Sequence, residues 1–172
     1  GPIAYIVRAR FVGLRDLGPA LPPQSAFQII QGLETVSLRM EKHCSNAAKV
    51  AEYLSNHNKV SRVIYAGLDE GEAGERANKY LKGGHGALCG IELKGGKASG
   101  EKFINNLNMF YHVANIGDAR SLAIHPASTT HSQLSDEDME SAGVNPSYVR
   151  LSIGIEHIDD IIEDLKNALD AA

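Results

Sequence analysis

The sequence predicts one α+β domain of two layers, in which helices cover a mainly antiparallel sheet. Three observations support this fold class. Segments with strand periodicity alternate with segments of helical periodicity along the chain. Several links between the expected strands are too short for a parallel crossover. The length of 172 residues suits one domain, and we see no internal repeat, so residues 1–172 are expected to form a single domain.

Helices are expected to occupy the first third of the chain. Residues 3–16 have a helical pattern, which glycine and proline end. Ser25, followed three residues later by Gln28, predicts a capping box with Ser25 as the N-cap of a long helix. A bend is expected at Gly32. An apolar stripe runs along this helix, and we expect it to pack in the core. It comprises Ala26, Ile29, Leu33, Val36, Met40, Cys44, Ala47, Ala51 and Leu54.

Shorter elements follow in alternation. Apolar runs predict strands, and amphipathic runs between glycine or proline residues predict helices. Ser135 and Asp138 form a second expected capping box, and Asp159 and Asp160 lie near the positive end of the last helix. The expected strands are 60–68, 87–95, 110–115, 120–125 and 148–156, and the expected helices are 72–81, 97–108, a helix after 135, and 158–172.

Composition excludes several classes of function. The net charge of −4 and the scattered basic residues argue against nucleic acid or an anionic membrane as a partner. No apolar run is long enough for a membrane span, and no signal peptide is visible. The two cysteines, Cys44 and Cys89, form no CxxC pair, which favours a reducing cytoplasm. We interpret Gly1-Pro2 as a remnant of tag cleavage, and the chain as an excised part of a longer protein.

Two polar segments are candidates for chemistry. The glycine-rich residues 82–87, "KGGHGA", could cradle a phosphate, but a helix that ends through glycine before a strand explains them better. Residues 125–138, "HPASTTHSQLSDED", contain His125 and His131. Their spacing does not match a known metal site, and no nucleophile elbow is present. The segment remains a candidate ligand-facing loop. No metal site is predicted.

Arg150 is the third candidate. In "SYVRLSIGIE", residues 147–156, apolar residues alternate with others, which is typical of a strand with one buried face. Arg150 is on the other face, beside Ser152 and Gly154, and these small residues are expected to leave room for a ligand. Pattern alone favours a solvated charge at this position, yet a guanidinium is also well suited to bind a carboxylate or phosphate through two parallel hydrogen bonds.

Three stretches together carry a family resemblance. They are "QGLETVSLRMEKHCSNAAKVAEYL", "NIGDARSLAIHPASTTHSQL" and "GVNPSYVRLSIGIEHIDDIIEDL". In this order they closely resemble the C-terminal part of the cysteine and methionine metabolism enzymes that use pyridoxal phosphate. The early "AYIVRARFVGLRDLG" is most similar to the O-acetylhomoserine sulfhydrylase branch of that family. One departure is "LPPQSAF", which replaces the more usual Ser-Pro-(Phe or His)-Asn before the long helix.

The resemblance implies the small C-terminal domain of a type I pyridoxal-phosphate fold, usually found in cytoplasmic homotetramers. The implied reaction is a γ-replacement, in which O-acetyl-L-homoserine and sulfide give L-homocysteine and acetate in methionine biosynthesis. The arginine that holds the substrate α-carboxylate falls on Arg150, and two further residues of that pocket fall on Asn115 and Thr130. No lysine here has the family's Ser-x-x-Lys context. The resemblance therefore places the cofactor lysine, and the large domain through which the subunits associate, outside this chain.

Other functions stay open at this point. Within the family, the alternatives are a cystathionine γ-synthase or a methionine γ-lyase relative. In another class, the chain could be a non-catalytic α+β ligand-binding domain. An upstream large domain with the lysine motif would favour the enzyme.

Overall fold

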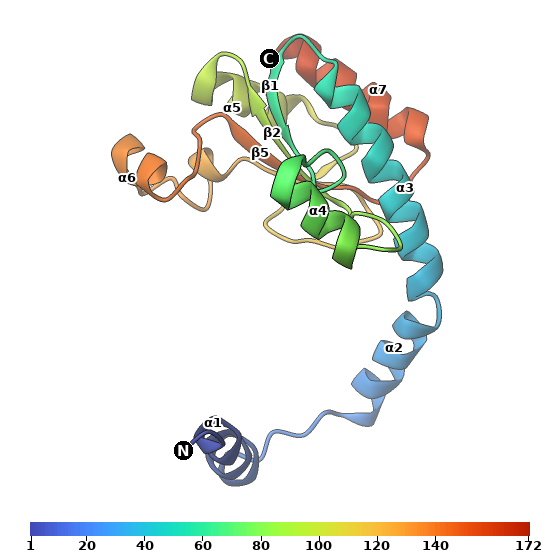
Figure 1. The fold of residues 1–172 in the computed structure, drawn as a ribbon, viewed down its shortest axis with the longest axis vertical. Coiled ribbons are helices and arrows are strands. Elements are labelled where there is room, and N and C mark those ends of the chain that lie inside the picture. The colour runs from blue at the N-terminus through green and yellow to red at the C-terminus, as the bar shows by residue number, and fades with distance from the viewer. The chain divides into compact units, whose positions relative to one another are not determined.

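The structure is a computed structural model. It describes the backbone of residues 1–172 and the side chains of all of these except Asp136 and Glu140. The chain divides into two compact units, residues 1–37 and residues 38–172, which are described separately below. Figure 1 shows the helices and strands of both units.

The first unit is helical, as expected. Helix α1 (Ala4–Arg8) continues as the π-helix η1 (Ala9–Asp16), and α2 spans Pro23–Glu34. The predicted N-cap at Ser25 is wrong, because α2 begins at Pro23 with Pro22, three residues before Ser25, as its N-cap. Proline at the first helical position has a backbone φ already suited to a helix, and the N–H that it lacks would have no intrahelical partner. Most large apolar side chains of this unit are exposed.

The long helix is interrupted near the predicted bend. Helix α3 spans Val36–Ser55, so the interruption lies at Thr35 rather than at Gly32. Thr35 has φ −115° and ψ 9°, outside the helical region. The apolar stripe packs in the core only in the second half of α3, at Ala47, Ala51 and Leu54. The prediction was wrong for its earlier part, where Ile29, Leu33, Val36 and Met40 are exposed.

The second unit contains one five-stranded sheet in the order β1-β2-β5-β4-β3. Three neighbouring pairs are antiparallel, and only β3 and β4 run parallel, which confirms the mainly antiparallel prediction. In Figure 1 the labelled strands β1, β2 and β5 lie side by side. The strands are β1 (Val60–Ile64), β2 (Leu88–Leu93), β3 (Tyr111–His112), β4 (Leu122–Ile124) and β5 (Tyr148–Ser152).

The helices between the strands also match the predicted segments. The predicted capping box at Ser135 is present, because Ser135 Oγ accepts the Asp138 N–H at 3.1 Å. Asp159 and Asp160 lie in the first turn of α7, as predicted. The elements are α4 (Gly71–Tyr80), α5 (Gly96–Asn106), the 3₁₀ turn η2 (Pro126–Ser128), α6 (Asp136–Ser141) and α7 (Ile158–Ala171).

One face of the sheet is buried and the other is open. The buried face carries apolar side chains of β1, β2, β4 and β5 that form one core with residues of α3, α5 and α7. Pairing across the strands puts Val63, Ile91 and Val149 in one row of that face. The next residue of each strand points to the opposite face. The open face therefore carries Ile64, Gly90 and Arg150 in register.

Buried polar groups fix the turns around the core. The Asp164 carboxylate, 7% exposed on α7, accepts the backbone N–H groups of Asn108 at 2.9 Å, Met109 at 3.0 Å and Phe110 at 3.4 Å. These contacts attach the turn after α5 to the last helix. None of the helices in the described part of the chain has the length and apolar character that a membrane crossing requires.

Candidate functional site

Strand β5 places Arg150 on the open face of the sheet. Its neighbours Val149 and Leu151 are fully buried, so their packing fixes the direction in which Arg150 leaves the strand. Gly90 lies directly opposite on β2, and a Cβ atom there would approach the Tyr148 ring to 2.5 Å. The absence of a side chain at Gly90 therefore lets the Tyr148 ring lie over β2. Burial raises the pKa of the Tyr148 hydroxyl, and the positive charge of Arg150 opposes that rise.

Arg150 contacts Asn115, the second predicted site residue. The Arg150 Nη2 donates a hydrogen bond to the Asn115 carbonyl oxygen at 3.2 Å. The Asn115 side chain is turned toward its own backbone, where Oδ1 accepts the Ile116 N–H at 2.9 Å. Asn115 thus contacts Arg150 through its backbone carbonyl, whereas its amide side chain stabilises the turn.

Thr130, the third predicted residue, lines the same cavity as Arg150. This cavity is about 590 Å³ in volume and also contains His131, Tyr148 and Ile124. Thr130 Oγ1 and His131 Nδ1 lie 2.9 Å apart and share a hydrogen bond. The structure therefore brings the three predicted residues together at one place on the open face.

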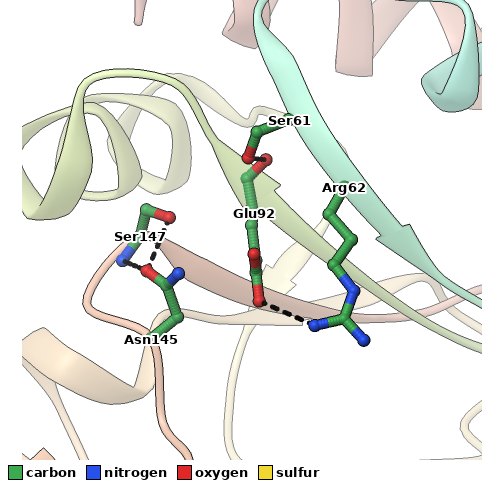
Figure 2. Close-up of polar contacts among 5 residues, drawn as sticks. All are labelled: Ser61, Arg62, Glu92, Asn145 and Ser147. Carbon is green, nitrogen blue, oxygen red and sulfur yellow. Dashed lines mark hydrogen bonds and ion pairs between the residues drawn. The ribbon is translucent and has the colours of Figure 1, made fainter. Parts of the chain in front are cut away.

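An ion pair lies elsewhere along this cavity. Figure 2 shows Arg62 of β1 directed toward Glu92 of β2, with 3.6 Å between Arg62 Nη1 and Glu92 Oε1. In the same view, Ser61 Oγ donates to the Glu92 carbonyl oxygen, and Asn145 Oδ1 accepts both the N–H and the hydroxyl of Ser147.

Arg150, in contrast, has no carboxylate partner within 4.0 Å among the side chains that the structure describes. Its hydrogen bond is with a neutral carbonyl oxygen, that of Asn115. A half-buried guanidinium with a single neutral acceptor retains donors for an anion, and a carboxylate matches its planar geometry. The electrostatics of the site thus favour an acidic ligand group at Arg150.

The prediction that Ser152 and Gly154 leave room for a ligand was wrong. Neither leaves open space for a ligand. Ser152 is 2% exposed, and its Oγ accepts the Gly117 N–H at 3.1 Å. The space beside Gly154 is filled, because a Cβ there would meet the Glu156 carboxylate, the Ala119 carbonyl oxygen and the Ser121 nitrogen.

His125 has a structural role. It is fully buried; its Nε2 lies 2.8 Å from the Pro146 carbonyl oxygen and its Nδ1 lies 2.8 Å from Ser128 Oγ. The carbonyl can only accept, so Nε2 carries the proton and Nδ1 accepts the Ser128 hydroxyl. Burial lowers the pKa of this imidazole. These contacts attach the "HPASTTH" segment to the turn before β5.

Metal ligands are not gathered in the described part of the chain, where no group of three or more His, Cys, Asp or Glu side chains could hold an ion. The glycine-rich residues 82–87 connect the end of α4 at Tyr80 with the start of β2 at Leu88, as the favoured interpretation predicted. Gly84, with φ +134°, packs against Cys44.

A family model described as "Cys/Met metabolism PLP-dependent enzyme" matches residues 5–170. The chain belongs to this family. The O-acetyl-L-homoserine sulfhydrylase of Leptospira meyeri is 55% identical over 97% of the chain and 38% of the relative. An L-methionine gamma-lyase of Fusobacterium nucleatum is 45% identical over 94% of the chain and 41% of the relative. The chain thus spans about two fifths of the length of these curated relatives.

A solved structure gives the same result. The crystal structure of an O-acetylhomoserine (thiol)-lyase from Campylobacter jejuni matches with a TM-score of 0.85 and 42% identity, over 95% of this chain and 39% of that one. That structure carries N'-pyridoxyl-lysine-5'-monophosphate, and its modified lysine lies outside the part that this chain matches.

The lysines of this Cys/Met metabolism family member do not fit a cofactor attachment at the site. No lysine is among the residues that line the cavity beside Arg150. Lys59 is occupied elsewhere, since its Nζ donates to the carbonyl oxygens of Leu169, Asp170 and Ala172. The remaining lysines are exposed: Lys42, Lys49, Lys79, Lys82, Lys94, Lys97, Lys102 and Lys166. The described residues thus offer a guanidinium that suits an acidic group and provide no covalent anchor for pyridoxal phosphate at this cavity.

Sequence reasoning missed one part of this family member's site. Ser121, Ser152 and Glu156 hold the chain that carries Asn115, and none was a candidate. One pattern could have indicated them: Ser152, Gly154 and Glu156 continue the alternation that begins at Arg150, on the same side of the strand.

Proposed function

We propose that this chain is the C-terminal, substrate-carboxylate-binding domain of a pyridoxal-phosphate enzyme that makes L-homocysteine from O-acetyl-L-homoserine and sulfide. The observation that carries the proposal is the Arg150 guanidinium, which lies in a cavity with Thr130, is held by Asn115 and has no ion-pair partner among the described side chains. Similarity to O-acetyl-L-homoserine sulfhydrylases supports the choice of reaction. We call the longer protein that would contain the chain the parent enzyme.

In this proposal Arg150 binds the substrate α-carboxylate through two parallel hydrogen bonds. The contact fixes the orientation of the bond from Cα to its hydrogen, which is a contribution to positioning. Asn115 limits the rotation of the guanidinium, and Thr130 offers a hydroxyl at the wall of the cavity. Pyridoxal phosphate, when bound, would supply the electron sink for proton loss at Cα. Its lysine anchor would come from outside residues 1–172.

An assay of the parent enzyme tests the reaction. Purified parent enzyme is supplied with pyridoxal phosphate and with O-acetyl-L-homoserine plus sulfide, and L-homocysteine and acetate are measured. In parallel, L-methionine alone is tested for release of methanethiol. We expect homocysteine formation to be much faster than the release of methanethiol from L-methionine. Dominant methanethiol release would instead support a methionine γ-lyase, which is also represented among the relatives at 45% identity. No turnover of either substrate would contradict the proposal.

The proposal includes a cytoplasmic location and a homo-oligomeric parent enzyme, a homotetramer as in most of its family. Two free cysteines support a reducing compartment. Exposed apolar residues in the first unit, among them Tyr5, Phe11 and Phe27, support a covered surface in the assembled enzyme. Sedimentation of the purified parent enzyme would give the number of subunits.

A further inference from the structure

We propose that Ser152, Ser121 and Glu156 are positioning residues for the carboxylate site. They hold residues 115–121 against the end of β5, so that the Asn115 carbonyl oxygen stays where it orients the Arg150 guanidinium. This inference rests on the proposed function, since it concerns how the same arginine is kept ready for substrate.

The first support is a regular set of contacts between two segments. Every second residue from Arg150 bonds to residues 115–121. Arg150 donates to the Asn115 carbonyl oxygen, and Ser152 Oγ accepts the Gly117 N–H. The Gly154 N–H then donates to Ser121 Oγ at 2.9 Å.

Glu156 completes the set from the last position. Its Oε1 accepts the Ser121 N–H at 2.6 Å, and its Oε2 accepts the Ser121 hydroxyl at 3.0 Å. The Ile155 N–H adds a backbone bond to the Ala119 carbonyl oxygen at 2.9 Å. Both oxygens of the Glu156 carboxylate are therefore directed at one residue of the 115–121 segment, which is a strong, charge-assisted attachment.

Burial makes these contacts hard to replace with water. Ser121 is fully buried and Ser152 is 2% exposed. Asn115 and Gly117, in contrast, are exposed, so little packing holds that part of the segment. Gly117 has φ +75°, a left-handed conformation that favours glycine and directs its N–H to Ser152. Before Asn115 the chain is held by the bond from the Val113 N–H to the Ala123 carbonyl oxygen, and after Asn115 the polar contacts from residues 152–156 are the main restraint.

The consequence for Arg150 follows from its flexibility. A free arginine side chain samples many rotamers, and binding must overcome the entropy of ordering it. A fixed carbonyl acceptor reduces that loss before substrate arrives. The side chains that fix the acceptor then affect substrate binding without touching the substrate, which is the expected behaviour of a supporting shell.

Variants of the parent enzyme test the inference. We would compare Ser152→Ala, Glu156→Ala and Glu156→Gln, with Ser61→Ala as matched control and Arg150→Ala as reference. Ser61 is an exposed β1 serine that donates to a backbone carbonyl and does not contact residues 115–121. The readouts are KM and kcat for O-acetyl-L-homoserine, and hydrogen–deuterium exchange of the peptide that contains residues 115–121. The exchange measurement does not depend on turnover.

The expected result is a split between KM and kcat. Ser152→Ala and Glu156→Ala should raise KM about three- to tenfold and leave kcat within about twofold, as expected for the loss of one or two hydrogen bonds at a distance. Exchange of the 115–121 peptide should accelerate. Glu156→Gln keeps one carbonyl oxygen that can accept the Ser121 N–H. It should therefore raise KM less than Glu156→Ala does. Ser61→Ala should leave both readouts unchanged.

Two outcomes would overturn the inference. One is faster exchange with an unchanged KM, which would show that the 115–121 segment does not orient Arg150. The other is a lower kcat with an unchanged KM, which would indicate a purely structural role. Either outcome leaves the proposed function intact if Arg150→Ala still raises KM strongly. If Arg150→Ala has no effect on KM, the carboxylate site itself is refuted, together with this inference.

Discussion

The Arg150 guanidinium donates to the Asn115 carbonyl oxygen at 3.2 Å across 35 positions of sequence. The contact joins a strand of the sheet to an exposed turn and leaves other guanidinium donors directed at the cavity. A conservative change at Arg150 should therefore be costly. A lysine keeps the positive charge but has a single nitrogen, which cannot form two parallel bonds with a carboxylate.

We expect Arg150→Ala in the parent enzyme to raise KM for the amino-acid substrate about 100-fold, equivalent to about 3 kcal/mol. Arg150→Lys should give a smaller but clear increase. The absorbance spectrum of the bound cofactor should not change, because in the proposed site the arginine binds the substrate and not the cofactor. Steady-state kinetics and absorbance measure both effects. Arg76→Ala, an exposed arginine of α4, is the control, and unchanged kinetics in Arg150→Ala would remove this residue from the site.

His125 should make stability depend on pH. Burial lowers the pKa of its imidazole in the folded chain. As the pH falls below about 6.5, the unfolded chain binds a proton that the folded chain binds only at lower pH. The free energy of unfolding should therefore fall with pH in this window, by at most about 1.4 kcal/mol per pH unit from this group. Below the folded pKa this contribution to the slope ends.

The variant His125→Asn isolates that contribution. It should be less stable at neutral pH, because contacts with Ser128 and Pro146 are lost, and its stability should vary less between pH 6.5 and 5. Urea unfolding at several pH values measures both quantities. An identical slope in wild type and variant would show that His125 does not cause the pH dependence.

The Asp164 carboxylate should contribute to stability through the turn after α5. In Asp164→Asn one of two acceptor oxygens becomes an NH₂ group that faces backbone N–H donors. We expect a loss of about 1–3 kcal/mol in the free energy of unfolding. Glu163→Gln makes the same chemical change at an exposed neighbour on α7 and should stay within about 0.5 kcal/mol. Equal effects of the two variants would contradict a specific role for Asp164.

The 172-residue chain alone should not bind pyridoxal phosphate covalently. Its cavity beside Arg150 contains no lysine among the described residues, and Lys59 is bonded to the end of α7. Incubation with the cofactor should give no stoichiometric absorbance band near the visible edge, and no homocysteine should form. A stoichiometric band that disappears on substitution of one lysine would show that the chain has its own attachment site.

The sequence predicted the order of elements well because their periodicity is local. Strand β5 is the clearest case, since Val149 and Leu151 are fully buried and Arg150 is only half-buried on the opposite face, as the alternation indicates. The prediction for the start of α2 was wrong for a local reason as well. The helix begins with Pro23 at its first position, and Ser25 does not serve as the N-cap.

Other features depend on contacts that no local pattern contains. The proximity of Arg150 and Asn115 came from family resemblance, since the two are far apart in sequence. Gly154 looked like free space because its own residue is small, whereas the Glu156 carboxylate fills that volume. The apolar stripe before Ala47 gave no indication that its first half would be exposed in this chain.

The alternate contacts from residues 150–156 to residues 115–121 also bear on how the sheet forms. A slip of two residues between β5 and its neighbours would keep apolar side chains on the core face, so the hydrophobic pattern alone cannot reject it. That slip would carry Arg150, Ser152 and Glu156 away from Asn115, Gly117 and Ser121 together. The same bonds that hold the segment beside Arg150 would thus select the correct strand pairing during folding, and mispaired chains would lack the proposed site.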